Sequence, residues 1–139
     1  MRDFSFFLAA KDVKKQSPDR HLANALIKES EDRLKLAKDL AKTQKPKYTV
    51  ENAYEAVREL IDAILYSEGY KSYSHEASIA YLGNLNFSAT DVERVDRLRE
   101  LRNGIKYRGE DASQEDATEA LIISEKMIKK LMEKIEFKT

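Results

Sequence analysis

The sequence predicts an all-α protein folded as an antiparallel bundle of four or five helices. Apolar residues recur every three or four positions through most of the 139-residue chain. No segment of useful length alternates with a period of two, and four Gly and two Pro are too few for the hairpins of an all-β protein. One domain is expected at this length. We assign residues 1–139 to a single helical domain whose core covers about residues 17–135.

The N-terminal third is expected to hold a short helix and a long one. Aromatic residues predict a helix or turn over about residues 4–14. Ser17 and Pro18 are typical of a helix start, with the serine as N-cap and the proline at the first helical position. The long helix should reach about Lys42, because Pro46 disfavours helix at the residue before it.

The central part of the chain predicts a second long helix and a short one. The clearest apolar periodicity runs from about Thr49 to Gly69, where the glycine would end the helix in a left-handed conformation. Ser74 would cap a short helix over residues 75–82, which Gly83 would stop.

Two more helices complete the predicted bundle. Thr90 and Glu93 have the spacing of a capping box, so a third long helix should begin there and end at Gly109. The last helix would be capped by Asp111 or by Ser113, and its apolar stripe continues almost to the end of the chain.

Composition excludes several classes of protein. There is no Cys, which removes disulfides and thiolate metal sites, and His21 and His75 alone cannot form a His-rich metal centre. No glycine-rich phosphate loop or EF-hand spacing is present, so we expect neither a metal nor a cofactor. No apolar run approaches the ~20 residues that span a bilayer, and no targeting signal is evident. We therefore expect a cytoplasmic protein that does not enter a membrane.

An arginine lies inside the apolar stripe of the third long helix. On a helical wheel, Leu98, Leu101 and Ile105 define the stripe, and Arg102 projects into it. A buried guanidinium is costly unless it meets an anion, a carboxylate or a polar cavity. Spacing leaves two interpretations open: a structural ion pair with a neighbouring helix, or a binding site for an anion.

Polar residues accompany this arginine in the sequence. Asn103 and Tyr107 are four positions apart and should lie on the same flank of the helix. Gly104 in mid-helix costs about 1 kcal/mol relative to Ala, and such a glycine often marks close approach of a backbone or a ligand. Lys106 and Arg108 would keep the neighbourhood positive.

The segment Arg102-Asn103-Gly104-Ile105-Lys106-Tyr107 resembles the signature of HEPN domains, in which Arg is commonly followed by Asn and then by His five residues after the Arg. These are small all-helical domains, and the resemblance extends over roughly residues 17–135. Family members are typically four- or five-helix bundles that dimerise, with two motif copies facing each other across a cleft. Many are metal-independent ribonucleases, and others are partners of minimal nucleotidyltransferases in toxin–antitoxin pairs.

The resemblance implies roles for the motif residues. Arg102 would contact a phosphate and stabilise the charge that develops during strand cleavage, and Asn103 would orient the arginine or the substrate. Lys106 and Arg108 would add positive charge for binding. Tyr107 stands where the family has His, and a phenol with a reference pKa near 10 does not accept a proton at neutral pH as His does.

Two residues elsewhere are candidates to support this site. His75 is the nearest substitute for the missing motif histidine, and Glu76 is a candidate salt-bridge partner for Arg102. A histidine at a helix start is otherwise a surface residue or a local hydrogen-bonding group.

The resemblance predicts a homodimer that recognises RNA or a nucleotide phosphate, within a toxin–antitoxin or defence system. It leaves open whether the domain is an enzyme, namely a metal-independent ribonuclease. The alternative function is a non-catalytic helical interaction module that binds a minimal nucleotidyltransferase partner. In a third interpretation, Arg102 is only structural in a stable dimer.

Overall fold

The computed structural model describes residues 1–138 of the chain. Along these residues, six helices and two short strands follow one another. The elements in order are α1 (Phe4–Ala9), β1 (Val13–Lys15), α2 (Arg20–Lys42), α3 (Pro46–Ser67), β2 (Tyr70–Ser72), α4 (His75–Asn84), α5 (Ala89–Tyr107) and α6 (Gln114–Lys138). The all-α fold class is confirmed, with a two-stranded sheet as a small addition. None of these helices combines the length and apolar character needed to cross a membrane.

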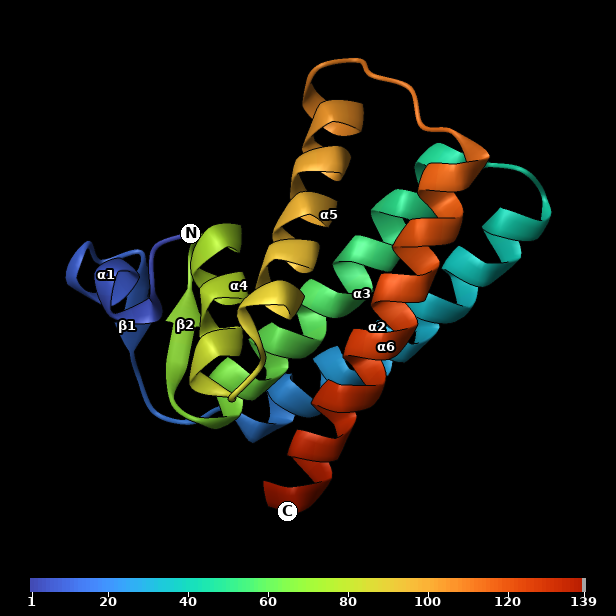
Figure 1. The fold of residues 1–139 in the computed structure, drawn as a ribbon. Coiled ribbons are helices and arrows are strands. Elements are labelled where there is room, and N and C mark those ends of the chain that lie inside the picture. The colour runs from blue at the N-terminus through green and yellow to red at the C-terminus, as the bar shows by residue number, and fades with distance from the viewer. Residues whose placement is uncertain (139) are drawn as a thin grey trace.

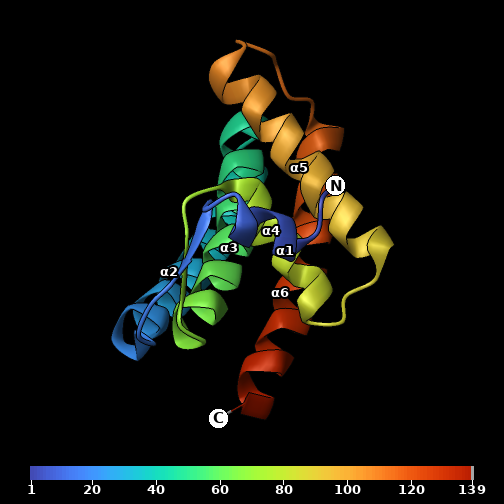
Figure 2. The same cartoon turned by 90° about the vertical axis from the view of Figure 1, so that its left-hand side faces the viewer.

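The helix α3 lies at the centre of the molecule. The helices α2 and α6 run along it, and α4 and α5 pack against it from another side (Figure 1). The strand β2 contacts α3 and α4, and α1 packs on α4 beside the two-stranded sheet (Figure 2). Because α3 has neighbours on several sides, any polar residue it carries in the core faces another helix.

The sequence of α3 explains its central place. Its apolar residues are not confined to one stripe, and small ones among them let neighbouring helices approach. Buried serines on α2 and α6 use this closeness: Ser30 donates to the carbonyl of Ala56 at 2.7 Å, and Ser124 donates to the carbonyl of Ala53 at 2.9 Å. The buried apolar residues of α3 are Val50, Ala53, Tyr54, Ala56, Val57, Leu60, Ile61, Ala63, Ile64 and Leu65.

The start of α2 differs from the prediction. The N-cap is Asp19, whose side chain accepts a hydrogen bond from the backbone N–H of Leu22 at 3.0 Å, so the helix begins at Arg20. Ser17 and Pro18 therefore precede the helix instead of opening it. The expected end at Lys42 is confirmed.

The predicted N-cap is wrong for α5 and is confirmed for α6. Ser88, not Thr90, is the N-cap of α5, and its hydroxyl accepts from the N–H of Asp91 at 3.1 Å. At the start of α6, Ser113 and Asp116 exchange two hydrogen bonds, of 3.0 and 2.9 Å, each from a backbone N–H to the other's side chain. This reciprocal pair is a capping box.

The start of α3 and the end of α4 differ from the prediction. The helix α3 begins at Pro46, three residues before Thr49, because proline fits the first helical position. Ser74 caps α4 as expected, but the helix continues through Gly83 to Asn84.

The two-stranded sheet was not predicted. The strands are antiparallel, with Val13 opposite Ser72, and they replace the second half of the helix or turn expected over residues 4–14. The turn into β2 requires glycine, since Gly69 has a φ of +87° and a Cβ there would lie 2.7 Å from the carbonyl oxygen of Gln16. The sheet holds the chain before α4 against the segment before α2.

Candidate functional site

Arg102 is buried between α5 and α3. Its side chain is on the core face of α5, as the apolar stripe predicts, and the residue is 5% exposed. One terminal nitrogen, Nη2, donates to Oε1 of Glu55 at 3.1 Å, and Nη1 donates to Oδ1 of Asn103 at 3.2 Å. The buried Nε has no hydrogen-bond partner in the described part of the chain. A buried donor without a partner is costly, so the guanidinium has capacity for a further acceptor.

Glu55 links Arg102 to a polar network that crosses the core. Its Oε2 accepts from Arg58 at 2.5 Å, and Arg58 also donates to Asp62 at 2.6 Å. Asp62 in turn accepts from the hydroxyl of Ser78 on α4 at 2.6 Å. We call Arg102, Glu55, Arg58, Asp62 and Ser78 the polar network. It joins α5, α3 and α4 at the level of the predicted motif.

The charges of this network are balanced by its own carboxylates. Burial opposes ionisation of Glu55, but the hydrogen bond from Arg58 and the charges of Arg58 and Arg102 lower its pKa below the ordinary value. Burial raises the pKa of Asp62, against the effect of Ser78 and Arg58. Glu55 is therefore the anion that holds Arg102 in place.

Tyr54 lies beneath the guanidinium of Arg102, on the core side. Its ring centroid is 5.5 Å from Cζ of Arg102, and the tyrosine is fully buried. Its hydroxyl is 3.0 Å from Nδ1 of His75. Burial raises the pKa of Tyr54, so the phenol stays protonated and can donate to Nδ1 or accept from it, according to the tautomer of His75.

The pKa of His75 is lowered to about 4 from its ordinary 6.5, first by burial and then by the charge of Arg58. Between these pH values the unfolded chain binds a proton that the folded chain excludes, so stability rises with pH across this window. Relative to a His75→Gln variant, the wild type should lose about 1–2 kcal/mol as the pH falls from 6.5 to 4, a value reduced for partial exposure. Urea unfolding of both proteins across this range measures the difference. A constant difference would contradict the assignment.

Tyr107 covers the solvent side of the same arginine. The tyrosine is 67% exposed, and its ring centroid is 5.6 Å from Cζ of Arg102 and 5.9 Å from Nζ of Lys106. The structure thus brings Arg102, Asn103 and Tyr107 together, as the motif implies. Arg102 lies between the buried Tyr54 and the exposed Tyr107.

The other motif cations have carboxylate partners on the surface. Lys106 is 3.5 Å from Glu51, and Arg108 is 3.1 Å from Glu110. Together with the Arg102–Glu55 pair, these contacts neutralise each of the three predicted cations within the chain. The two surface pairs are solvated and individually worth little, so an anion can exchange for their carboxylates.

Two expectations around the motif are corrected by the contacts. The carboxylate that pairs with Arg102 is Glu55, whereas Glu76 lies 3.8 Å from Arg99. Gly104 provides room for the chain itself: the side chain of Glu110 folds over it, and the N–H of Glu110 donates to its carbonyl at 3.0 Å. The mid-helix glycine therefore serves the turn after α5 and not a ligand.

The sequence did contain a signal for Glu55. A charged residue within the continuous apolar pattern of α3 must meet a partner, just as Arg102 must on α5. The two lie 47 residues apart, so neither sequence pattern alone identifies the other.

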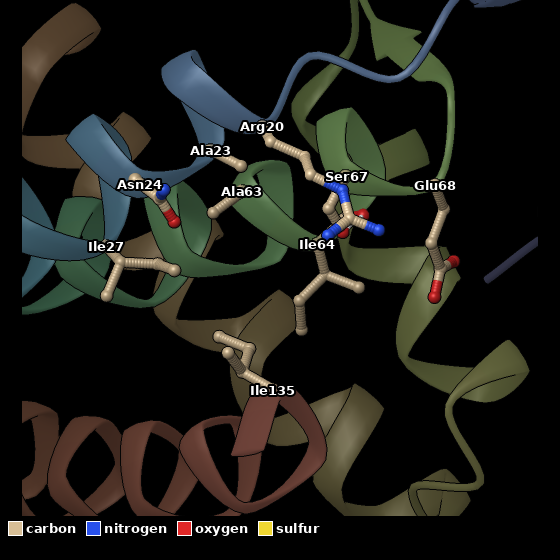
Figure 3. Close-up of a pocket in the computed structure, with 9 residues that line it drawn as sticks. All are labelled: Arg20, Ala23, Asn24, Ile27, Ala63, Ile64, Ser67, Glu68 and Ile135. Atoms are coloured by element: carbon tan, nitrogen blue, oxygen red, sulfur yellow. Dashed lines mark hydrogen bonds between the residues drawn. The ribbon is translucent and has the colours of Figure 1, made fainter. Parts of the chain in front are cut away.

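A cavity of about 400 Å³ lies elsewhere, between α2, α3 and α6. Figure 3 shows the polar side chains of Arg20 and Asn24 and the apolar side chains of Ile27, Ile64 and Ile135 around it. None of its lining residues belongs to the polar network. Among the described residues, no group of His, Cys, Asp or Glu side chains is arranged to hold a metal ion.

Comparison with known proteins identifies the family of this chain. The model of the HEPN domain family matches residues 23–135. The chain belongs to the HEPN domain family. Its fold is similar to the crystal structure of TT1696 from Thermus thermophilus, with 15% sequence identity, a TM-score of 0.71, and coverage of 81% of this chain and 97% of that chain. No curated protein shows significant sequence similarity to it.

The matched range includes the segment that resembles the family signature. Arg102 and Tyr107 lie in the last two turns of α5, within the matched range.

Proposed function

We propose that this HEPN domain recognises phosphate groups of RNA through Arg102. The observation that carries the proposal is the buried guanidinium with an unpartnered Nε next to an exposed aromatic residue. A guanidinium has five N–H donors, and the described hydrogen bonds occupy Nη1 and Nη2 only once each. Charge-assisted hydrogen bonds to a phosphate would use this remaining capacity.

The surroundings give each motif residue a role. Glu55 and Tyr54 hold the guanidinium in one orientation from the core side. Asn103 occupies Nη1 through its side-chain oxygen, and rotation of this half-buried amide would free that donor for a phosphate oxygen. Lys106 and Arg108 would exchange their surface carboxylates for neighbouring phosphates.

We propose that this protein binds RNA but cleaves it slowly. Metal-free cleavage of RNA requires a group that takes the proton of the attacking 2′-hydroxyl. The motif histidine that would take this proton is replaced by Tyr107, and Nδ1 of His75 is engaged in a hydrogen bond with Tyr54. The wild-type chain is therefore a slow ribonuclease.

We further propose that the domain acts as a cytoplasmic homodimer, within a toxin–antitoxin or defence system. The support is the exposed Tyr107 on the same face as Arg102, which a second copy would cover across a shared cleft.

Arg102→Gln tests the proposal. The variant should bind a fluorescein-labelled oligouridylate about 10- to 100-fold more weakly than wild type, because a hydrogen bond to a charged group contributes about 1.5–3 kcal/mol. Fluorescence anisotropy in low salt measures the change. Arg97→Gln is the matched control, since Arg97 is an exposed arginine of the same helix. Equal affinities of the two variants would reject Arg102 as the phosphate-binding residue.

A second function has its own support. The motif cations are paired within the chain, and the Tyr107 hydroxyl group belongs to an exposed residue, so this face also suits a protein partner such as a minimal nucleotidyltransferase. In that case RNA should not bind, and Tyr107 should carry a nucleotidyl group in its native host. Intact-mass measurement of wild type and Tyr107→Phe distinguishes this function from RNA recognition.

A further inference from the structure

Four lysines in the two-stranded sheet and in the turn before it carry positive charge without an ion pair in the described part of the chain. We call Lys11, Lys14, Lys15 and Lys71 the lysine ribbon. None of them forms an ion pair in the described part of the chain, and the neighbouring acidic residue, Asp12, forms none either. The ribbon therefore carries a local excess of positive charge on a protein whose formal net charge is zero.

Two lysines of the ribbon face each other across the sheet and share an aromatic neighbour. Lys14 and Lys71 are directly opposite each other in the antiparallel sheet, where like charges repel. Their ammonium groups lie 5.5 and 5.2 Å from the ring centroid of Tyr73, which is 59% exposed. Two cations and an exposed aromatic ring on one face suit a ligand with negative charges and flat rings.

The three predicted cations at the motif end of α5 differ from the ribbon in this respect. Arg102, Lys106 and Arg108 each contact a carboxylate of the chain. Long-range attraction of a polyanion needs charge that is not already compensated. The lysines of the ribbon carry charge that is not compensated by an ion pair in the described part of the chain.

The ribbon and the motif are connected through short contacts. Tyr73 lies two residues before His75, whose ring is bound to Tyr54 beneath Arg102. The hydroxyl of Ser72 in β2 is 2.9 Å from that of Ser78, the last member of the polar network. In Figure 1, β2 leads directly into the start of α4, which lies beside α5.

We infer that single-stranded RNA bound at Arg102 continues past the start of α4 onto the lysine ribbon. Phosphates contact Lys14 and Lys71 there, and a base stacks on Tyr73. The inference rests on the proposed function, because it extends the strand from the phosphate site at Arg102. The ribbon then provides most of the electrostatic attraction for the RNA, and Arg102 provides a hydrogen-bonded contact of fixed orientation to one phosphate.

The salt dependence of binding tests the ribbon. The probe is a labelled oligouridylate longer than the roughly 4–16 nucleotides that one small domain occupies. In Lys14→Gln/Lys71→Gln, the slope of log K against log salt should become about 1.4 less negative, since each phosphate contact to a single strand contributes about 0.7. Tyr73→Leu should weaken binding about tenfold with little change in slope.

Two controls accompany these variants. Lys35→Gln/Lys42→Gln removes the same charge from exposed positions of α2 and should leave the slope unchanged. The Lys14→Gln/Lys71→Gln protein should unfold at a urea concentration close to that of wild type, because it loses a repulsive pair together with two exposed cation–π contacts to Tyr73. A slope change without loss of stability then reports RNA contact.

The outcomes separate the two proposals. If Arg102→Gln weakens binding and the ribbon variants match the α2 control, the ribbon inference is wrong and the proposed function stands. If the ribbon variants weaken binding and Arg102→Gln does not, the assignment of Arg102 is wrong and the strand path from it is overturned. If wild type binds no RNA, both are overturned.

Discussion

Replacing Glu55 with alanine is expected to lower the free energy of unfolding by about 3–5 kcal/mol. The carboxylate is buried, and each of its oxygens accepts a hydrogen bond from a different guanidinium, Arg102 at 3.1 Å and Arg58 at 2.5 Å. Removing it leaves both cations in the core, where only Arg58 keeps a carboxylate partner, Asp62. Removal of one member of a buried ion pair is costly because the other charge stays buried. Urea denaturation followed by circular dichroism measures the loss.

Glu51→Ala is the matched control for this prediction. Glu51 lies one turn earlier on α3 and pairs with the exposed Lys106 at 3.5 Å. A solvated pair of this kind should contribute no more than about 0.5 kcal/mol. If the two alanine variants lose equal stability, Glu55 does not anchor Arg102 in the manner described.

The Tyr107→His variant is expected to cleave RNA without metal about 10²- to 10⁴-fold faster than wild type. The substitution restores the histidine that stands five residues after the arginine in the signature that this sequence resembles. The position is 67% exposed, so an imidazole there can accept a proton near neutral pH. Its ring would lie near Arg102, which stabilises the charge that develops on phosphate.

Cleavage of a labelled oligonucleotide in the presence of a chelator tests this gain. Tyr107→Phe controls for loss of the hydroxyl group and should show no gain. The double variant Tyr107→His/Arg102→Gln should return to the wild-type rate or below it. If Tyr107→His is no faster than Tyr107→Phe, the missing histidine does not explain slow cleavage.

Helical periodicity was sufficient to predict the fold class, but not the exact helix starts. The starts of α2 and α5 were misplaced because several residues that can cap a helix stand close together at each. Asp19 competes with Ser17, and Ser88 competes with Thr90. Only the backbone geometry decides which side chain meets a free N–H group.

The two-stranded sheet escaped detection for a different reason. Three residues in each strand are too few to show an alternating pattern. Its pairing also joins Val13 to Ser72, which are distant in the sequence and are brought together by α2 and α3. The lysine ribbon was therefore invisible before the fold was known.

The candidate site was predicted in part. The apolar stripe placed Arg102 toward the core, and the structure confirms that it is buried. A helical wheel gives the direction of a side chain but not the helix it faces. Glu55, Tyr54 and the bond between Tyr54 and His75 followed only from the packing of α3 against α5 and α4.

If an RNA phosphate binds Arg102, the Nε–H group of this arginine should report the binding most directly. The Nε is buried and has no partner in the described part of the free protein. In ¹⁵N-resolved spectra recorded during titration with oligouridylate, we predict that the Arg102 Nε–H resonance shifts in proportion to saturation, while that of Arg97 does not. An Arg102 resonance that stays unchanged while the RNA saturates the protein would contradict the claim.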